Sequence, residues 1–313
     1  MKLIKSIVMA GALIGGLAAA TSAADLNKIG ISLGSMGNPF FVALANGAKA
    51  EAQKLNPDVE VLALGYDYDL GKQFNQIDNF IAAGVDMILL NPGDPNAIEP
   101  AIKRAQKAGI IVVSVDTAAK GSDATVTTDN VSAGRVACQY IVDKLNGKGN
   151  VIIQNGPQVS AVIDRVNGCK EVFNDHKGIK VLSDDQDGKG SRDGGMEVML
   201  GHLTRYKNID AVFAINDPQA IGTNLAALQL KRKDIIITSV DGAPDIVAAL
   251  KDPKSPMIQA SGSQDPYHMA SLAVEIGYGI MEGKQPEQKV VLLPSALVDR
   301  NNVDNYMGWD AVR

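Results

Sequence analysis

Hydrogen-bonding side chains recur in this chain at the ends of its short apolar segments. They are Ser35, Asn38, Asn91, Asp116, Asn155, Asn216, Asp241 and Gln264, with Arg165 at the start of a predicted helix. A carboxylate or a guanidinium group can bind two neighbouring hydroxyls through charge-assisted hydrogen bonds. Phe40 and Phe41 follow Asn38 and offer ring faces to apolar C–H groups. This chemistry suits a small ligand with many hydroxyls, although Asp and Asn after a strand can also be helix caps.

The segment around Asn38 indicates how such groups are positioned. Lys28–Leu33 predicts a strand, and the residues from Gly34 to Gly37 predict a tight turn. Pro39 suits a first helical turn, and the apolar spacing predicts a helix over Phe40–Leu55. Ligands of such strand–loop–helix units bind beyond the carboxyl ends of the strands. The alternative is an ordinary turn in which Asn38 caps the helix and both phenylalanines belong to the core.

Predicted strands and helices alternate along the whole chain. The strands are Lys28–Leu33, Val59–Leu64, Met87–Leu90, Ile110–Val115, Ala124–Thr127, Asn150–Ile153, Ile179–Asp184, Ala211–Ile215, Ile235–Val240, Met257–Gly262 and Val290–Leu293. The helices are Phe40–Leu55, Leu70–Ala83, Ile98–Ala108, Val131–Leu145, Ala161–Asp175, Arg192–Arg205, Pro218–Leu228, Asp245–Leu250 and Pro266–Met281. Short apolar strands alternating with helices are typical of parallel sheets covered on both faces.

The number of predicted strands is too large for one compact flavodoxin-like sheet, so we expect an α/β fold with two parallel-sheet lobes. No Gly/Ser-rich linker separates the halves, which predicts short crossings between the lobes. The polar strand ends of two facing lobes would line one cleft. The net charge of −5 argues against a nucleic-acid partner, which would require a basic surface.

The N-terminus has the features of a secretory signal. Lys2 and Lys5 precede an apolar run over Ile7–Ala20, and small residues follow up to Ala24. We therefore expect residues 1–24 to be a cleaved signal peptide and the mature protein to be periplasmic. In an oxidising compartment Cys138 and Cys169, on two predicted helices, are expected to form a disulfide. Two buried thiols are the alternative.

Motifs for other chemistries are absent or weak. The chain has no GxGxxG after its first strand, no GxxxxGK[ST] loop and no GxSxG elbow. His176, His202 and His268 show no metal-ligand spacing, and Lys189 interrupts the calcium-like run from Asp184 to Gly188. We expect no cofactor and no metal.

Two aspartates allow other interpretations. Asp116 and Asp241 could be paired catalytic carboxylates, but without another catalytic signature we interpret them as acceptors for ligand hydroxyls. Asp217 precedes Pro218 and is predicted to be a helix cap.

The order and spacing of several motifs resemble a known family over nearly the whole mature chain. They are Asn38-Pro39-Phe40-Phe41, Asn91-Pro92, Ser114-Val115-Asp116, Thr128-Asp129-Asn130, Asp164-Arg165, Phe213-Ala214-Ile215-Asn216-Asp217, Val240-Asp241-Gly242 and Gln264-Asp265-Pro266. The chain resembles type I periplasmic sugar-binding proteins of the ribose-binding kind, the receptor subunits of ABC sugar importers.

The resemblance implies two Rossmann-like lobes joined by three hinge crossings, near Thr127–Asn130, Ser261–Gln264 and Leu292–Leu297. The N-terminal lobe would hold residues 25–128 with 263–293, and the C-terminal lobe residues 129–262 with 294–313. The resemblance also implies a sugar site built from Asn38, Phe40, Phe41, Asp116, Arg165, Asn216, Asp241 and Gln264. Ser35, Asn91 and Thr117 stand beside these residues and complete the expected ligand-binding set.

Two positions depart from the family pattern. Thr117 stands where an Arg often follows the first-lobe Asp, and Gly190 stands where an aromatic residue often precedes Arg192. One guanidinium and one ring wall are therefore expected to be missing. Tyr66, Tyr68 and Trp309 are the aromatic residues that could compensate, although we favour packing roles for all three.

These observations favour a non-enzymatic, monomeric receptor for a neutral monosaccharide (a pentose or hexose) or a polyol, which closes around its ligand and delivers it to a membrane ABC permease. Alternatives are a sugar sensor that presents its closed form to a chemoreceptor, and an exported sugar hydrolase or epimerase. A sugar-responsive repressor is disfavoured, because a signal peptide stands in place of a DNA-binding headpiece.

Overall fold

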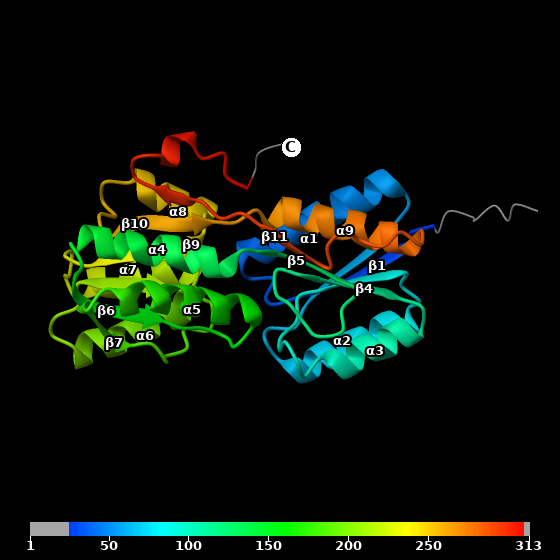
Figure 1. The fold of residues 1–313 in the computed structure, drawn as a ribbon, viewed down its shortest axis with the longest axis horizontal. Helices are drawn as coiled ribbons and strands as arrows, with labels where there is room; N and C mark the ends of the chain where they lie inside the picture. The colour runs from blue at the N-terminus through cyan, green and yellow to red at the C-terminus, as the bar shows by residue number, and fades with distance from the viewer. Residues whose placement is uncertain (1–24, 310–313) are drawn as a thin grey trace, which may run out of the picture.

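A computed structural model describes residues 25–309 of the chain, and the predicted signal peptide lies outside these residues. Two lobes lie side by side along the long axis of the molecule (Figure 1). Each lobe is built on one six-stranded sheet, with strand orders β11-β5-β4-β3-β1-β2 and β12-β10-β9-β8-β6-β7. The two orders match position by position, so the chain repeats one winding pattern. The predicted α/β fold with two parallel-sheet lobes is confirmed.

The first sheet is parallel throughout. Its strands are β1 (Lys28–Leu33), β2 (Glu60–Gly65), β3 (Met87–Leu90), β4 (Ile111–Val115), β5 (Ala124–Thr128) and β11 (Val290–Leu293). Its helices are α1 (Pro39–Leu55), α2 (Leu70–Ala82), α3 (Glu99–Lys107) and α9 (Pro266–Met281). Helices α1 and α9 cover one face and α2 and α3 the other, which places an apolar core on each side of the sheet (Figure 1). Double coverage explains why these strands are continuous apolar runs.

The second sheet contains β6 (Lys148–Gln154), β7 (Gly178–Ser183), β8 (Ala211–Ala214), β9 (Ile236–Asp241), β10 (Ile258–Ser263) and β12 (Leu297–Asp299). Its helices are α4 (Asn130–Lys144), α5 (Ser160–Asp175), α6 (Arg192–Arg205), α7 (Asp217–Gln229) and α8 (Pro244–Lys251), with a short 3-10 turn η1 (Val303–Asn305). Edge strand β12 runs antiparallel to β10. This strand was not predicted from the sequence, because three residues after a turn carry no periodic signal.

The chain passes between the two sheets three times, after β5, after β10 and between β11 and β12. Hydrogen bonds tie the crossing segments together. The Asp129 amide donates to the Leu293 carbonyl at 2.8 Å, and the Ser263 amide donates to the Ala296 carbonyl at 2.7 Å. The Thr128 hydroxyl donates to the Gln264 side chain at 2.7 Å. The crossings therefore form one bonded bundle of short segments, the arrangement expected of a hinge.

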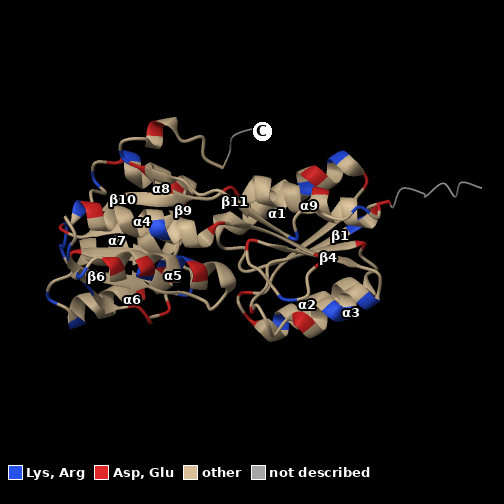
Figure 2. Ribbon diagram, in the orientation of Figure 1, with Lys and Arg blue, Asp and Glu red and all other residues tan. Residues whose placement is uncertain are grey.

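Acidic and basic residues are interspersed over both lobes on the face that Figure 2 shows. That face carries no continuous basic stripe among the described residues, in agreement with the net charge of −5. Between residues 25 and 309, no helix has both the length and the apolar character needed to cross a membrane.

Candidate functional site

A cavity of about 40 Å³ lies between the two lobes, at the carboxyl ends of both sheets. Side chains from both lobes line it. They are Asn38, Phe40, Phe41, Tyr68, Asn91, Asp116, Thr117, Pro157, Val159, Ala161, Val162, Arg165, Gly190, Ile215, Asn216, Asp241 and Gln264. We call this space the inner cavity.

The first-lobe side of the inner cavity is held by backbone caps and side-chain hydrogen bonds. Asn38 caps α1, with its side-chain oxygen accepting from the Phe40 amide at 3.0 Å. The Asn91 amide group donates to the Asp116 carboxylate at 2.8 Å and to the Thr117 hydroxyl at 2.9 Å. The Thr117 hydroxyl donates onward to the Pro92 carbonyl at 3.1 Å. Asn91 therefore orients Asp116, and the proton of the Thr117 hydroxyl is directed away from that carboxylate.

Asp241, at the end of β9, is the main acceptor on the second-lobe side. Its Oδ1 accepts from the Gln264 amide at 2.7 Å, and its Oδ2 lies 3.3 Å from the Asp217 amide nitrogen. Nη1 of Arg165 lies 3.5 Å from Oδ1 of Asp241. Because Gln264 belongs to a hinge crossing and accepts from Thr128, Asp241 is connected directly to the hinge.

Arg165 is fixed by three neighbouring groups. Its Nε donates to the Asn130 side chain at 2.8 Å, and its Nη1 donates to the Ile215 carbonyl at 2.9 Å and approaches Asp241. The residue is buried and belongs to α5, not to a loop. A guanidinium held in this way loses little further freedom when it binds a ligand.

Close packing of α4 against α5 sets the position of Arg165. A Cβ atom at Gly134 of α4 would lie 2.1 Å from the Arg165 carbonyl, and one at Gly168 of α5 would lie 2.1 Å from the Val131 carbonyl. Only glycine permits this approach. A disulfide between Cys138 and Cys169 joins the same two helices.

Asp116 and Asp241 both have backbone conformations that favour glycine, with φ angles of 65° and 145°. Backbone strain of this kind costs of order 1–3 kcal/mol per residue and is found at functional sites. Asp116 directly follows β4 and Asp241 is the last residue of β9, and these two strands occupy equivalent positions in the two sheets. The same strained aspartate therefore occurs once on each side of the cavity.

Burial changes the acidity of both aspartates. Burial raises the pKa of Asp116 to about 6, although Arg165 and the Asn91 hydrogen bond oppose the change. Burial also raises the pKa of Asp241 to about 7, against the opposing influence of Arg165 and Gln264. Both carboxyl groups can therefore exchange protons near neutral pH.

Asp217 is not a helix cap, contrary to the sequence prediction. Asn216 caps α7, with its side-chain oxygen accepting from the Gln219 amide at 3.1 Å. Asp217 is fully buried behind Asp241 and accepts from Ser261 at 2.7 Å and from the Ala243 amide at 2.7 Å. Burial and the nearby Asp241 raise the pKa of Asp217 well above its usual value.

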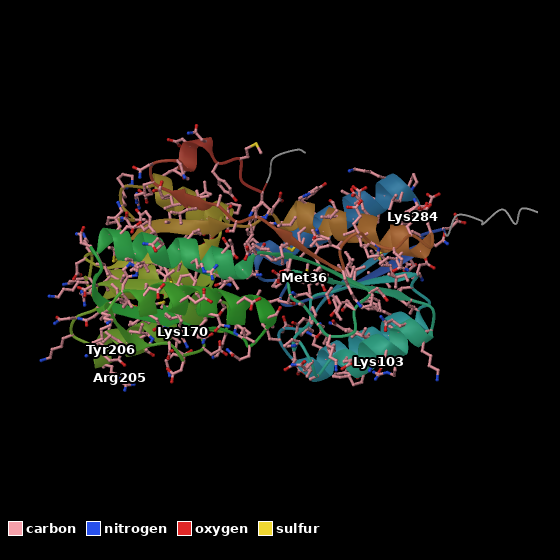
Figure 3. The ribbon with its side chains drawn as sticks, in the orientation of Figure 1. Met36, Lys103, Lys170, Arg205, Tyr206 and Lys284 are labelled. Atoms are coloured by element: carbon pink, nitrogen blue, oxygen red, sulfur yellow. A yellow bond between two sulfur atoms is a disulfide. The ribbon has the colours of Figure 1, made fainter. Side chains whose placement is uncertain are left out.

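The structure brings most of the predicted ligand-binding residues to one place. Asn38, Phe40, Phe41, Asn91, Asp116, Thr117, Arg165, Asn216, Asp241 and Gln264 all line the inner cavity. Ser35 lies instead on a larger space nearer the surface, which we call the outer cavity. It lies in the turn after β1, and Met36 of this turn is labelled beside the boundary between the lobes in Figure 3. Asn155 does not line the inner cavity either, and donates to the Asp184 carbonyl.

Tyr68 lies in the cavity, although its predicted role was packing. It lines the inner cavity, and a Cβ atom at Gly190 in the opposite lobe would lie 3.5 Å from its hydroxyl. The loops that carry these residues have consecutive positive φ angles, at Asp67 and Tyr68 and at Lys189 and Gly190. Tyr68 therefore supplies, from the first lobe, a ring near the position where the family often has one in the second.

The other two aromatic residues pack as predicted. Tyr66 is fully buried. Trp309 lies edge-on to Phe40, with ring centroids 5.8 Å apart, and its indole N–H is shared between the Gln264 carbonyl at 3.0 Å and the Asp241 carbonyl at 3.2 Å. Trp309 thus supports a cavity-lining ring of the first lobe from the C-terminal segment.

The lobes are closed over the inner cavity. The Ala118 amide of the first lobe donates to the Ser160 hydroxyl of the second at 2.7 Å. Asp116, Arg165 and Asp241 are each less than a tenth exposed. Closure thus removes the charged groups from water. In the interior of the protein their hydrogen bonds to a ligand are stronger than in water.

Comparison with known proteins agrees with this geometry. A family model described as a periplasmic binding protein domain matches residues 29–285. The chain belongs to the periplasmic binding protein family. Among curated members of the family, the ribose import binding protein RbsB of Bacillus subtilis is 35% identical over 273 residues, covering 86% of each chain. The xylitol-binding protein of Mycolicibacterium smegmatis is 31% identical over 257 residues, covering 79% of this chain and 72% of the relative.

Solved structures of periplasmic binding proteins share the fold. An ABC transporter solute binding protein from Bacillus halodurans with bound myo-inositol has a TM-score of 0.81 and 26% identity, covering 91% of this chain and 99% of its own. A galactofuranose binding protein has a TM-score of 0.82 and 29% identity, covering 89% and 96%.

Proposed function

We propose that this periplasmic binding protein is the receptor of an ABC importer for a small sugar or polyol, which it binds between its lobes and delivers to a membrane permease. The single observation that carries the proposal is the closed inner cavity, whose polar side chains come from both lobes. Ligand that bridges the lobes stabilises the closed form, which the permease can distinguish from the open form. Relatives named for ribose, xylitol and galactofuranose support the ligand class.

The ligand-binding residues we propose are the predicted ones that line the inner cavity, with Tyr68 added and Ser35 removed. Asp116, Asp241 and Arg165 would bind ligand hydroxyls through charge-assisted hydrogen bonds. Phe40, Phe41 and Tyr68 would cover apolar C–H faces. The amides of Asn38, Asn216 and Gln264 would orient the remaining hydroxyls.

Several further features belong to the same proposal. The mature protein is periplasmic and monomeric, and it forms the Cys138–Cys169 disulfide. The boundaries between its two lobes lie at residues 128/129, 262/263 and 293/294. Support comes from the signal-like N-terminus and from the three crossings between the sheets. Presentation of the closed form to a chemoreceptor is compatible with the same site.

A thermal-shift screen of pentoses, hexoses and polyols tests the proposal. A ligand that binds only the native state raises the unfolding temperature by mass action. We expect at least one carbohydrate or polyol to stabilise the protein in a saturable way. Stabilisation by amino acids alone would contradict the proposal.

The raised pKa values of Asp116 and Asp241 would also suit a general acid, so a sugar hydrolase or epimerase is the second candidate. We propose that the protein is not an enzyme, because Asp116 is oriented by Asn91 and Asp241 by Gln264 as hydrogen-bond acceptors. Incubation of the protein with its ligand, followed by NMR of the recovered ligand, distinguishes the two. Any product would favour the enzyme.

A further inference from the structure

The charges around the inner cavity do not balance. Among the described residues that line it, Asp116 and Asp241 are acidic and Arg165 is basic, which leaves a net charge of −1 when both carboxyl groups are ionised. Asp217 adds a third carboxyl group directly behind Asp241. A buried charge without a counterion is costly, so this excess must be relieved by a proton or by the ligand.

Arg165 does not serve both lobes equally. Its guanidinium lies 3.5 Å from the Asp241 carboxylate and donates hydrogen bonds to Asn130 and Ile215, which belong to the same lobe as Arg165. Asp116 receives the neutral Asn91 amide, and the adjacent Thr117 hydroxyl donates to the Pro92 carbonyl. Asp116 is thus a buried carboxylate of the first lobe whose hydrogen-bonded partner in the structure is uncharged.

The surroundings of Asp116 favour a cation. Phe40, Phe41 and Tyr68, all of the same lobe, line the cavity with it, and aromatic faces attract ammonium groups. The N-termini of α1 and α7 also reach the cavity, but Asn38 and Asn216 cap them. These helix ends provide partial charges and not a counterion.

We propose that the site selects a sugar or polyol that carries a basic nitrogen, whose ammonium group pairs with Asp116 while its hydroxyls bind Arg165 and Asp241. The inference rests on the proposed function and narrows its ligand from a neutral carbohydrate to an amino sugar or an amino polyol. The net charge of the residues that line the cavity then falls to zero on binding, and Asp116 gains a counterion.

Matched pairs of ligands test the inference by calorimetric titration. The pairs are glucosamine with glucose, 1-amino-1-deoxyribitol with ribitol, and scyllo-inosamine with scyllo-inositol, each differing only in an amino or hydroxyl group. We expect the amino member to bind about tenfold more tightly or better in at least one pair, as a charge-assisted bond in a closed site allows. Equal or tighter binding of the hydroxyl member in every pair that binds would overturn the inference.

Two variants assign the preference to a residue. Asp116→Asn keeps the shape of the side chain and removes its charge, so it should abolish the preference for the amino member. Asp67→Asn removes the same charge from the same lobe, but Asp67 lies in the outer cavity, is largely exposed and pairs with Lys72 at 2.7 Å. It should leave the preference unchanged. A preference that survives Asp116→Asn would overturn the assignment.

The pH dependence supplies an independent readout. Arg165, Tyr66 and Tyr68 surround Asp116, and Arg165, Asp217, Tyr68 and Tyr306 surround Asp241. The amine of 1-amino-1-deoxyribitol stays protonated as pH falls from about 8 to about 5, while both carboxyl groups gain protons, so the preference for it over ribitol should shrink. A preference that grows with acidification would contradict the pairing.

Failure of this inference differs from failure of the proposed function. If a neutral sugar or polyol binds and no amino counterpart binds better, the protein remains a sugar receptor and only the inference fails. If neither member of any pair binds and the thermal-shift screen finds no carbohydrate, the proposed function fails and the inference fails with it.

Discussion

Asp241 has two candidate roles at the residue scale, and the structure separates them. A residue after a strand is often a helix cap. Here, however, the N-cap position of α8 belongs to Ala243, whose amide donates to Asp217. Asp241 instead accepts from Gln264 and pairs with Arg165 inside the cavity. The carboxylate is therefore available to a ligand and is not used in capping.

Asp241→Asn should weaken ligand binding much more than it changes stability. The variant keeps the side-chain volume, and a hydrogen bond to a charged group is worth about 1.5–3 kcal/mol. We therefore expect a loss of about 10–100-fold in affinity, measured by calorimetric titration. A urea unfolding curve is the control. Near-normal affinity would remove Asp241 from the site.

The buried carboxyl groups predict an unusual pH dependence of stability. Their folded-state pKa values of about 6 and about 7 lie above the unfolded-state value of about 3.9, so the folded protein binds protons more tightly. The free energy of unfolding of the ligand-free protein should therefore rise as pH falls from about 8 to about 5.

The change in the free energy of unfolding with pH depends on how far the two lobes stay closed. For Asp116 the raised pKa corresponds to at most about 3 kcal/mol in the free energy of unfolding. Opening of the lobes would rehydrate the carboxylate and make this contribution smaller. Urea midpoints across this pH range provide the measurement. Asp116→Asn should make the profile less steep, because only the contribution of Asp241 remains, and a wild-type profile that falls steadily with acidification would contradict the prediction.

At the scale of the elements, the pairing of α4 with α5 determines where Arg165 lies. Gly134→Ala would place a methyl group against the backbone of Arg165, and forcing extra atoms into close packing costs about 1–3 kcal/mol. We expect both stability and ligand affinity to fall, the latter because Arg165 moves.

Gly201→Ala in α6 is the matched control for this variant. A Cβ atom at Gly201 meets nothing within 4 Å, and an exposed helical Gly→Ala change stabilises by about 0.5–1 kcal/mol. Equal effects of the two variants on affinity would show that helix spacing does not position Arg165.

The disulfide joins the same two helices and should act mainly on stability. Its cysteines are 31 residues apart, and closing a loop of this length contributes roughly 3–4 kcal/mol in the chain-entropy model. The double variant Cys138→Ala/Cys169→Ala should lower the unfolding temperature and leave ligand affinity within about threefold. Mass spectrometry without reductant checks that wild-type protein contains the bridge, and two alkylatable thiols would contradict it.

The alternation of strands and helices could be predicted from sequence because each sheet is covered on both faces. A strand that is covered on both faces must be apolar throughout, so it is recognised in the sequence as a continuous apolar run such as Met87–Leu90. The antiparallel strand β12 was missed, because it is a strand through its pairing with β10 and its own three residues carry no strand pattern. Tyr68 was assigned to packing for a related reason, since it approaches Gly190 only when two lobes, distant in sequence, close.

At the scale of the whole molecule, Trp309 contacts both lobes and a crossing between them. It packs on Phe40 of the first lobe, while its indole N–H is shared between the carbonyls of Asp241 in the second lobe and Gln264 in a hinge crossing. It is also the one tryptophan in the sequence. The tryptophan emission of the protein therefore reports on the contact between the lobes.

Ligand binding should change this emission, because closure fixes the indole against Phe40 and removes water from around it. We expect a saturable change in intensity or wavelength, with a midpoint that matches the calorimetric dissociation constant. Trp309→Phe keeps a ring but removes the N–H donor, and one lost hydrogen bond of about 1 kcal/mol should weaken ligand binding about fivefold. The two acceptor carbonyls already lie together, because the Gln264 amide donates to the Asp241 carbonyl at 2.8 Å. The lost bond should therefore lower the unfolding temperature as well, and affect affinity by loosening the indole against Phe40. Emission unchanged at saturating ligand, together with wild-type affinity of Trp309→Phe, would show that the C-terminal segment takes no part in closure.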